Sequence, residues 1–517
     1  MNKSLLQKLL DYYHLSYEEY LHITRSVTPS SFLEGHQFDD IDNAVNLVKK
    51  VMANKGKIII YGDYDADGIM GTSILTKMFN YLDYVTSFYI PNRYKDGYGI
   101  TLEHAKEYVD NGYELVITVD NGISAFEPID YLKSHGVKVL ILDHHQVQDT
   151  VPNADVICHP TYSHYGETPS SGAFTAFVFS IALLDRIDKY LSILASISLI
   201  SDMMPLLDYN RDLLRDTFKD YIPGEFLQID LLSDHEPLEE GVIGMKIAPR
   251  INSIGRLVDD DSISNIVNFF ISNDKDYILN YYAYILEMNE TRKNLSKEVA
   301  SLDLEEVSDA IVIKGEYKEG IIGLIANSLV NKYHVPCVVF TNTADGDLKG
   351  SARAPIGFDI VKAFTALSDT LITFGGHASA GGCSVSQENY QKFHDDFIAL
   401  ARNTPLEYVP NPTIDISFTD VNNENYELIN SFSPFGEAWP IPLLKISHIK
   451  VDTLTFSRDE KHILTMVGSS LKLVGFNFNK KDVQENRFID MVGTMKKGSY
   501  RGISYLEFNI KEIIPNN

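Results

Sequence analysis

Cysteine, basic side chains and long apolar runs are all scarce in this chain of 517 residues. Its three cysteines, Cys158, Cys337 and Cys383, lie far apart and form no CxxC pair. This spacing excludes a disulfide framework and a zinc ribbon, and it is typical of a reducing compartment. We therefore expect a cytoplasmic protein.

No apolar run approaches the ~18 consecutive residues that a membrane-spanning helix needs. The N-terminal segment carries charges throughout and lacks an apolar stretch followed by small residues, so we expect no signal peptide. The sequence thus predicts no membrane partner. Hydrophobic residues still make up 44% of the chain, which is enough to build several cores.

Basic residues are outnumbered, with 45 Lys and Arg against 71 Asp and Glu and a formal charge of −26. Phosphate contacts usually come from Lys and Arg, so this balance opposes a broad nucleic-acid-binding surface. Two interpretations remain open. Either the substrate is small, or a local basic groove and bound cations offset a repellent outer surface.

A regular alternation of strand and helix patterns begins after residue 50, whereas residues 1–50 are predicted to be helical. The predicted strands are Lys57–Gly62, Val85–Ile90, Glu114–Val119 and Val137–Leu142, and the predicted helices between them are Gly71–Leu82, Thr101–Asn111 and Ser124–His135. Such a succession predicts an α/β fold with a doubly wound parallel sheet. We expect this domain to span residues 51–270.

Three further parts are expected downstream. The tract Asp276–Val307 lacks Gly and Pro and predicts a long connecting helix within residues 271–308. A second α/β unit is predicted for residues 309–402. Beyond the linker Asn403–Pro412, which holds three prolines, short alternating segments predict a small β-barrel over residues 410–517.

The positions of the acidic residues are the most informative feature of the sequence. Three of the predicted strands run directly into polar residues: Asp63, Asp65 and Asp67 follow the first strand, Asp120 the third, and Asp143, His144 and His145 the fourth. Ligands of an open parallel sheet bind beyond the carboxyl ends of its strands. Three strand ends therefore bring five carboxylates and two imidazoles to one edge.

So many carboxylates cannot remain ionised close together without cations between them, because like charges disfavour one another's ionised forms. Carboxylate oxygens with a few imidazoles suit Mn²⁺ or Mg²⁺, whereas zinc prefers more His or Cys. Two such cations ~3.5–4 Å apart can hold an attacking hydroxide and stabilise the leaving oxygen of a phosphoryl transfer. Asp120, on the middle segment, is the candidate for the bridging carboxylate.

Each acidic residue taken alone also has a structural explanation. An aspartate at a strand end often caps the next helix or forms a turn. Asp143 either orients a histidine from behind or caps a turn. Asp202, which follows the apolar run Leu191–Ile200, fits a capped turn as well. The combination of these acids with the His144–His145 pair is what favours a metal site.

Several segments resemble a known family. GDYDADGIMGT, VDNGI, LDHHQ and ISDMMP resemble the four motifs of the DHH phosphoesterases. KIAPRINSIGRLVDD, KGSARAPIGFDI and FGGHASAGG then resemble, in the expected order, the RecJ-type single-strand-specific DNA exonucleases. The resemblance implies a DHH domain, a DHHA1-like domain and a C-terminal OB-fold-like barrel. The segment FSPFGEAWPIP departs from the family's usual Gly-Asn-Pro continuation, which leaves the contacts of that barrel in doubt.

The resemblance also implies roles for individual residues. The metal ligands would be Asp65, Asp67, Asp120, His144 and Asp202, with Asp63 beside them as a ligand or a supporting acid. His145 would touch the scissile phosphate as an acid or an electrostatic stabiliser. Two divalent cations, Mn²⁺ or Mg²⁺, are the implied cofactors.

Arg93 and Tyr98 lie in the loop after the second predicted strand, and thus at the same edge of the sheet. A guanidinium there can grip a phosphate with two hydrogen bonds, although Arg93 also fits a surface salt bridge. Tyr98 is a candidate for stacking on a base. Arg256 is expected to line the cleft between the two α/β domains, with packing as the alternative.

In the second domain, Ser351 and Arg353 are two residues apart on a predicted strand and so share one face. By resemblance they hold a terminal 5′ phosphate. Gly375, Gly376 and His377 belong to a glycine-rich segment whose backbone N–H groups could approach a phosphate closely. A glycine pair alone fits a tight turn equally well.

These features favour a metal-dependent 5′→3′ exonuclease that degrades single-stranded DNA to mononucleotides in repair and recombination. The alternative is a phosphodiesterase for short oligoribonucleotides or cyclic dinucleotides, which explains the acidity but gives the connecting helix and the C-terminal domain no role. A silent DNA-binding scaffold is disfavoured, because every expected ligand is present. By resemblance the partner is single-stranded DNA, a single-strand-binding protein or a helicase is a candidate protein partner, and a monomer is the default state.

Overall fold

The structure, a computed structural model, describes residues 3–25, 38–300, 307–343, 345–404, 406, 411–468, 471–500 and 503–516. The chain forms two compact units. Pro29–Tyr408 make up the larger unit, and Met1–Thr28 together with Val409–Asn517 make up the smaller one. None of the helices in the described part of the chain combines the length and the apolar character needed to cross a bilayer.

A parallel five-stranded sheet forms the centre of the larger unit, in the order β2-β1-β3-β4-β5. Its strands are β1 (Lys57–Tyr61), β2 (Ser87–Tyr89), β3 (Tyr113–Val119), β4 (Lys138–Leu142) and β5 (Val156–Cys158). β2 pairs on one side of β1, whereas β3, β4 and β5 follow in turn on the other side. The point at which the strand order reverses therefore lies between β1 and β3. Ligands of such sheets bind at that point, beyond the carboxyl ends of the strands. The predicted parallel α/β fold is confirmed.

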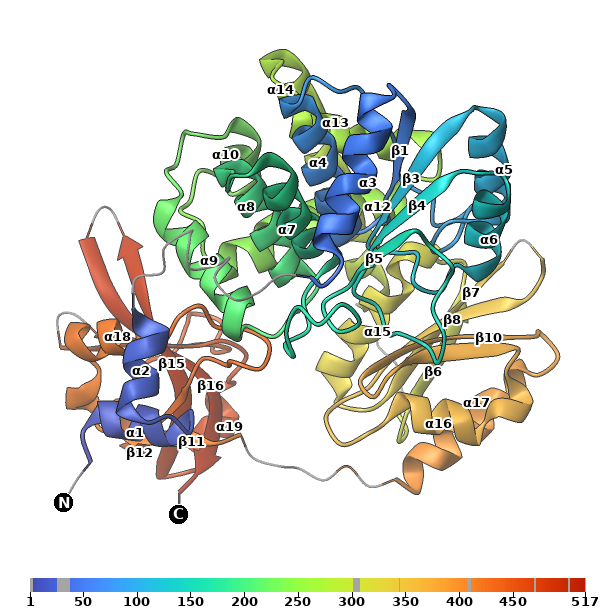
Figure 1. Ribbon diagram of the computed structural model, residues 1–517. Helices are drawn as coiled ribbons and strands as arrows, with labels where there is room; N and C mark the ends of the chain where they lie inside the picture. Colours follow the sequence, from blue (N-terminus) through green and yellow to red (C-terminus); the bar gives the residue numbers. More distant parts are fainter. Residues whose placement is uncertain are drawn as a thin grey trace. The chain divides into compact units, whose positions relative to one another are not determined.

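Helices cover both faces of this sheet (Figure 1). One face carries α5 (Leu102–Asp110) and α6 (Phe126–Ser134), and the other carries α3 (Ile41–Ala53), α4 (Ala66–Tyr81) and α7 (Gly172–Leu184). Because both faces of the strands are buried, their sequences are nearly continuous apolar runs rather than alternating ones. Helix α4 packs on both α7 and α8 (Lys189–Ser201), which explains why nearly all of its residues are buried.

The chain then continues through further helices to a long connecting helix. In order these are α9 (Asp208–Asp220), α10 (Leu227–Leu232), α11 (Glu240–Val242), a π-helical turn (Ile243–Ile247), α12 (Ala248–Leu257), α13 (Asn265–Ile271) and α14 (Lys275–Ala300). Helix α14 packs against both α12 and α15 (Glu319–Tyr333), so it does connect the two α/β parts of this unit. The part of the predicted helix Asp276–Val307 at residues 301–306 lies outside the described residues.

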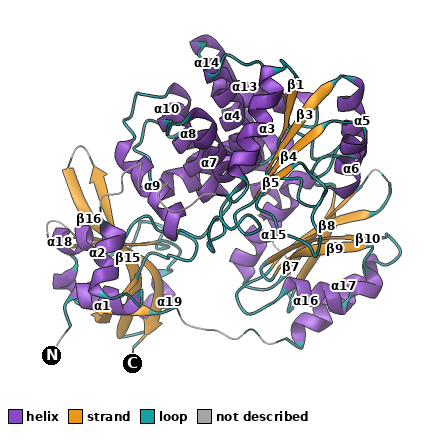
Figure 2. Cartoon of the chain, viewed as in Figure 1, coloured by secondary structure: helices purple, strands orange, loops and turns teal. Residues whose placement is uncertain are grey.

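A second, mixed sheet follows, in the order β6-β7-β8-β10-β9. Its strands are β6 (Ile311–Gly315), β7 (Cys337–Asn342), β8 (Leu348–Arg353), β9 (Thr373–His377) and β10 (Ala380–Val385). Figure 2 shows α16 (Ile360–Ala366) and α17 (Tyr390–Arg402) on one face and α15 on the other. The glycine-rich segment therefore forms an antiparallel hairpin of β9 and β10.

The smaller unit contains a six-stranded sheet in the order β11-β12-β15-β16-β14-β13. Its strands are β11 (Thr413–Ile416), β12 (Leu443–Lys450), β13 (Ile463–Val467), β14 (Leu471–Gly475), β15 (Phe488–Tyr500) and β16 (Ile503–Pro515), with α18 (Asn423–Asn430) and α19 (Lys480–Gln484) between them. β15 and β16 form a long hairpin. The predicted OB-like β architecture is present, with β11 and β13 at the two ends of the strand order.

The first two helices, α1 (Leu5–Tyr12) and α2 (Tyr17–Thr24), belong to this same smaller unit. The Tyr13 ring stacks on Trp439 with centroids 4.5 Å apart, and its hydroxyl donates to the carbonyl of Pro440 at 2.8 Å. Trp439 is 8% exposed and donates its indole N–H to the carbonyl of Phe432. The predicted helical segment 1–50 is thus divided, because α3 packs in the larger unit.

Candidate metal centre

Seven of the predicted polar residues meet at the carboxyl edge of the first sheet. Their possible ligand atoms form three overlapping groups, within each of which the atoms lie within 4.8 Å of one another: Asp63, Asp65 and Asp120; Asp120, His144 and His145; and Asp67, His144 and Asp202. Asp120 and His144 each belong to two groups. Asp120 thus adjoins both the Asp63–Asp65 pair and the two histidines, and its role as a bridging carboxylate stays a prediction.

The His144 imidazole lies at the centre of three carboxylates. Its Nε2 is 3.0 Å from Asp120 Oδ1, 3.4 Å from Asp67 Oδ2 and 3.5 Å from Asp202 Oδ2. Burial lowers the pKa of His144, although the neighbouring Asp67 opposes that shift. A neutral imidazole is the form that binds a metal.

Asp65 is positioned by the first turn of α4. It is the N-cap residue of this helix, and its Oδ1 accepts hydrogen bonds from the N–H groups of Asp67 at 2.9 Å and Gly68 at 3.2 Å. The cap starts α4 at Ala66, five residues before the predicted start at Gly71. The helix-cap explanation of Asp65 therefore holds, and its side chain still faces Asp63 and Asp120.

Asp67 is oriented by the N-terminus of α7. Its Oδ2 accepts from the N–H of Gly172 at 2.7 Å, and its Oδ1 accepts from the N–H of Ala173 at 2.7 Å and the hydroxyl of Ser198 at 2.6 Å. Because the first N–H groups of a helix have no partner within the helix, they are natural anchors for a carboxylate. Each carboxylate oxygen has a second lone pair, which leaves Asp67 able to bind a cation.

The backbone at Asp120 is in the left-handed region, with φ of +61° directly after β3. Non-glycine residues rarely adopt this conformation, and such strain is concentrated at functional sites. Helix α7 also approaches very closely, since a Cβ on Gly172 would lie 2.7 Å from the Cα of Asp120. A glycine at position 172 is therefore required for the two segments to meet.

The electrostatics of the cluster favour bound cations. Burial, together with the neighbouring Asp67 and Asp65, raises the pKa of Asp120 well above its usual range, and the same two causes raise the pKa of Asp202 to about 9. Burial and Asp65 likewise raise the pKa of Asp63. Among the described residues, Asp63 Oδ1 and Asp202 Oδ2 are buried and have no hydrogen-bond partner. Carboxylates and imidazole in this proportion fit Mn²⁺ or Mg²⁺.

Binding of Mn²⁺ is expected to release protons from the protein. Carboxyl groups with raised pKa values hold protons near neutral pH, and a cation must displace them to coordinate the oxygens. We expect about one proton or more per chain at neutral pH. Titration calorimetry in buffers of different ionisation enthalpy measures this number. Uptake of Mn²⁺ with no net proton release would show that these carboxyls are already ionised.

Asp143 organises the His144–His145 segment from behind. Its Oδ1 accepts from the N–H of His144 at 2.7 Å and from Nδ1–H of His145 at 2.9 Å, while its Oδ2 accepts from the N–H of Ile123. Burial opposes the ionised form, but the hydrogen bond and charge of His145 lower the pKa of Asp143 below its usual range. Both interpretations left open by the sequence therefore apply, because Asp143 orients a histidine and caps a turn.

This arrangement favours the protonated form of His145. Burial opposes protonation of the ring, yet the hydrogen bond and the charge of Asp143 raise the pKa of His145 to about 9. The Tyr98 hydroxyl oxygen lies 3.0 Å and 3.1 Å from the two ring nitrogens, and it donates to the carbonyl of Asp120 at 3.3 Å. Tyr98 thus contacts His145, and its predicted stacking on a base stays a prediction.

His159 is a contributor that the sequence gave no reason to select. It is 2% exposed and follows β5, the strand that was not predicted. Its Nε2–H donates to the carbonyl of His145 at 2.8 Å, and its Nδ1 accepts from the N–H of Thr161 at 3.2 Å. The neutral ring therefore ties the main chain of His145 to the neighbouring loop.

Replacing Asp143 by asparagine is expected to lower the pKa of His145. The amide keeps a hydrogen-bond acceptor but removes the negative charge that stabilises the imidazolium. If protonated His145 supports catalysis, the alkaline limb of kcat/KM shifts to lower pH by about one unit or more. A pH–rate profile of Asp143→Asn beside the wild type measures the shift. Superimposed profiles would show that deprotonation of His145 does not cause the alkaline limb.

Four arginines gather beside the Asp63–Asp65 side of the cluster. Three were predicted, Arg93, Arg256 and Arg353, and the fourth is Arg292 on α14. Burial, together with Arg93 and other neighbouring guanidinium groups, lowers the pKa of Arg256 to about 10. Arg93 lies 4.0 Å over the ring of Tyr64. Close approach of like charges in a buried region indicates a site for an anion.

None of these four arginines forms an ion pair with a carboxylate among the described residues, although the chain carries 71 acidic residues. Arg353 donates to the hydroxyl of Ser351 at 3.2 Å, and Arg256 donates to the carbonyl of Gly320 at 3.0 Å. Arg250 of the same region differs, since it pairs with Asp234 at 2.9 Å. We call Arg93, Arg256, Arg292 and Arg353 the arginine cluster.

The remaining predicted residues lie on the β9 edge strand. Gly375 pairs with Gly382 of β10, which in turn pairs with Ser351 of β8. Gly376 and His377 instead line a cavity next to His145. Their predicted role in phosphate binding stays a prediction.

Comparison with known proteins agrees with this arrangement. The DHH family N-terminal domain matches residues 57–199, the DHHA1 domain matches residues 306–403, and the RecJ OB domain matches residues 414–512. All three models match in the order that the sequence motifs implied. The chain is a DHH-family protein of the RecJ type.

Relatives of this DHH-family chain extend over most of its length. It is 28% identical to the single-stranded-DNA-specific exonuclease RecJ of Bacillus subtilis, over 93% of this chain and 64% of the relative. It is 26% identical to the protein of the same name from Haemophilus influenzae, over 88% of this chain and 86% of the relative. The chain thus spans less than two thirds of the Bacillus subtilis protein.

Solved structures of RecJ proteins share the fold. RecJ of Thermus thermophilus in complex with Mn²⁺ superposes with a TM-score of 0.81 at 21% identity, over 99% of this chain and 78% of that chain. An exonuclease RecJ bound to manganese superposes with a TM-score of 0.61 at 25% identity, over 72% of this chain and 96% of that chain.

Proposed function

We propose that this chain is a metal-dependent 5′→3′ exonuclease that degrades single-stranded DNA to mononucleotides. The observation that carries the proposal is a carboxylate–imidazole cluster directly beside four arginines that form no carboxylate ion pair within the described part of the chain. Relatives that align with most of this chain are named single-stranded-DNA-specific exonucleases, which supports the substrate. The high net negative charge is compatible with it, because the binding surface is local.

Two divalent cations fit the cluster. Asp63, Asp65 and Asp120 would hold one, and Asp67, His144 and Asp202 would hold the other. Asp120 Oδ1 lies 3.0 Å from His144 Nε2, so Asp120 is the candidate for a carboxylate shared by both. When bound, such a pair supplies a hydroxide nucleophile and stabilises the leaving oxygen of an in-line displacement. The hydrogen bonds to Asp65 and Asp67 keep these two carboxylates in fixed orientations, so little reorganisation is needed when substrate arrives.

His145 acts on the phosphate rather than on a metal. As an imidazolium held by Asp143, it can donate a hydrogen bond to a non-bridging oxygen of the scissile phosphate and stabilise the charge that develops there. Tyr98 and His159 contact His145 at its ring and its carbonyl, respectively, and limit its movement.

The arginine cluster would bind the terminal 5′ phosphate. A terminal phosphomonoester carries close to two negative charges and three acceptor oxygens, which matches several converging guanidinium groups better than an internal diester does. Arg353 and Ser351 are the contacts implied by resemblance, and Arg256 and Arg93 lie close enough to contribute. Anchoring the 5′ end next to the cleavage site sets the direction of degradation.

The C-terminal unit would supply a surface for the remaining strand. OB-type sheets bind single strands through cations and aromatic rings. Lys472 of β14 lies 5.7 Å from the ring of Tyr505 on β16, and Lys497 of β15 lies 4.9 Å from the ring of Tyr426. A single-strand-binding protein or a helicase as partner, a monomeric state, a cytoplasmic location and a role in repair and recombination stay predictions.

End-labelled oligonucleotides test the proposed activity. With Mn²⁺ and a 5′-phosphorylated single strand, we expect mononucleotides to be released from the 5′ end, and a blunt duplex to resist degradation. Degradation that ignores polarity or requires a duplex would contradict the proposal. Faster turnover of a dinucleotide or cyclic dinucleotide than of a long strand would instead support the small-substrate phosphodiesterase.

A further inference from the structure

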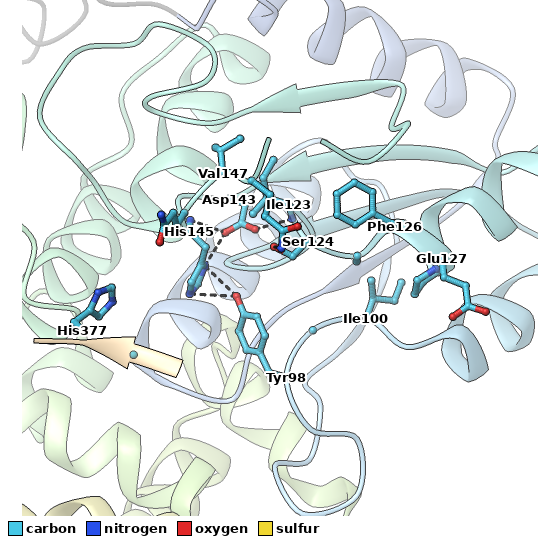
Figure 3. Close-up of a pocket in the computed structure, with 17 residues that line it drawn as sticks. Tyr98, Ile100, Ile123, Ser124, Phe126, Glu127, Asp143, His145, Val147 and His377 are labelled. Atoms are coloured by element: carbon cyan, nitrogen blue, oxygen red, sulfur yellow. Dashed lines mark hydrogen bonds and ion pairs between the residues drawn. The ribbon is translucent and has the colours of Figure 1, made fainter. Parts of the chain in front are cut away.

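A cavity of about 860 Å³ adjoins the metal centre on the side of His145 (Figure 3). It opens among the segments that follow β3 and β4, and β9 closes it from the second sheet. Representative lining residues are Tyr98, Ile100, Phe126, Val147, Gln148 and His377. The cavity is large enough for a nucleoside, and neither the metal ligands at Asp63 and Asp65 nor the arginine cluster reaches into it.

Side-chain charge in this cavity does not favour a phosphate. None of its seventeen lining residues, all from the described part of the chain, is a lysine or an arginine. Two of them, Glu127 and Asp143, are acidic and would repel an anion. His145 lies at the boundary with the metal centre.

The same lining suits a neutral, flat ring. Ile100 and Ile123 are buried and form an apolar wall, and the half-buried Phe126 ring lies beside them. Figure 3 shows Phe126 and Ile100 on one side of the space and His377 on the other. Gln146 and Gln148 provide amide groups that both donate and accept, so they can pair with any base edge.

The cavity and the arginine cluster adjoin different residues around the metal centre. Arg256 has Asp65 and the three other arginines of the cluster as charged neighbours, whereas Asp143 and His145 border the cavity. A strand whose 5′ phosphate occupies the arginine cluster would place its first nucleoside between that cluster and the cations. The next nucleoside of the strand would then lie beyond His145, at the cavity.

We propose that this cavity is the subsite for the nucleoside on the 3′ side of the scissile phosphate, and that Phe126 stacks on its base. The inference rests on the proposed exonuclease activity. After cleavage this nucleoside carries the new 5′ phosphate, so the subsite holds the shortened strand close to the metal centre between successive cuts. Recognition by stacking tolerates every base, because each base has a π face.

Oligonucleotides with one abasic residue test the assignment. The substrates are 5′-phosphorylated single strands with a normal sequence, an abasic first nucleotide or an abasic second nucleotide. For Phe126→Ala we expect KM to rise roughly tenfold on the normal strand and on the strand abasic at position one, with kcat little changed. On the strand abasic at position two, wild type and Phe126→Ala should have the same KM, because the stacking partner is already missing.

Two further variants serve as controls for the fold and for the aromatic ring. Phe126→Tyr keeps the ring and is expected to retain the wild-type KM, while Phe126→Leu keeps apolar volume and is expected to behave as Phe126→Ala. Equal rises in KM on all three substrates would overturn the assignment. So would a KM difference between wild type and Phe126→Ala that disappears on the strand abasic at position one instead of position two. Wild-type protein that fails to degrade the normal strand would instead overturn the proposed function, so the two failures are distinguishable.

Discussion

Replacement of Asp120 by alanine is expected to reduce exonuclease turnover to less than about one hundredth of the wild-type rate, because Asp120 is the proposed bridge between the two cations. The fold is expected to remain intact or to become more stable. A buried carboxyl whose pKa is raised in the folded state opposes folding at any pH above its unfolded pKa, and alanine removes that cost. Without metal, Tm should therefore stay level or rise by a few degrees.

Single-strand degradation in the presence of Mn²⁺ and thermal melting in a chelator provide the two readouts. Asp110→Ala is a matched control, since Asp110 is an exposed aspartate at the end of α5 and should change neither. Asp120→Asn keeps the side-chain shape and separates loss of charge from loss of volume. Retention of more than a tenth of the activity by Asp120→Ala would exclude Asp120 as the bridging ligand.

Arg353→Ala is expected to lower kcat/KM by roughly 10- to 100-fold on strands with a 5′ phosphate, and to change it little on strands with a 5′ hydroxyl. A charge-assisted hydrogen bond to a phosphate accounts for a loss of this size. The hydroxyl-ended strand lacks the terminal group that Arg353 would contact, so its kcat/KM should change little.

Steady-state kinetics on the two strands measure the difference. Arg402→Ala is the matched control, because Arg402 pairs with Asp309 on the surface of the same α/β part and should not discriminate between the ends. Equal losses of Arg353→Ala on both strands would show that Arg353 contributes to the fold or to general binding, and not to recognition of the 5′ end.

The first sheet was predictable because its signals are local. Buried parallel strands such as β1 and β3 are short apolar runs, and their ends are marked by aspartate and glycine. Since parallel strands all end at the same edge, the meeting of Asp63, Asp120 and His144 follows from topology without any knowledge of contacts. The predicted start of α4 at Gly71 was too late. Asp65 caps the helix, so the first turn already begins at Ala66.

The hairpin of β9 and β10 could not be predicted from local preference. Glycines favour turns, so local preference gives no reason to place Gly375 and Gly376 in a strand. In the fold they are needed because neighbouring strands crowd together: a Cβ on Gly376 would lie 2.4 Å from the carbonyl oxygen of Ala380. This requirement arises only after the strands have paired.

Long-range packing was the other source of error. Helix α1 packs on β11, and its Lys8 donates to the carbonyl of Asp415, 407 residues further along the chain. The stacking of Tyr13 on Trp439 likewise leaves no trace in the sequence pattern. The position of Arg292 could not be predicted for a similar reason. It is one cation on a charged helix, and only the packing of α14 against α12 and α15 brings it near Arg256.

In the proposed enzyme, side chains from separate strand ends hold two cations beside the arginine cluster. Anomalous diffraction from crystals soaked in MnCl₂ tests this arrangement most directly. Two manganese peaks about 3.5–4 Å apart, with Asp120 between them and His144 bound to one, are the expected result. A single peak, or peaks away from Asp67, Asp120 and Asp202, would contradict the two-cation account.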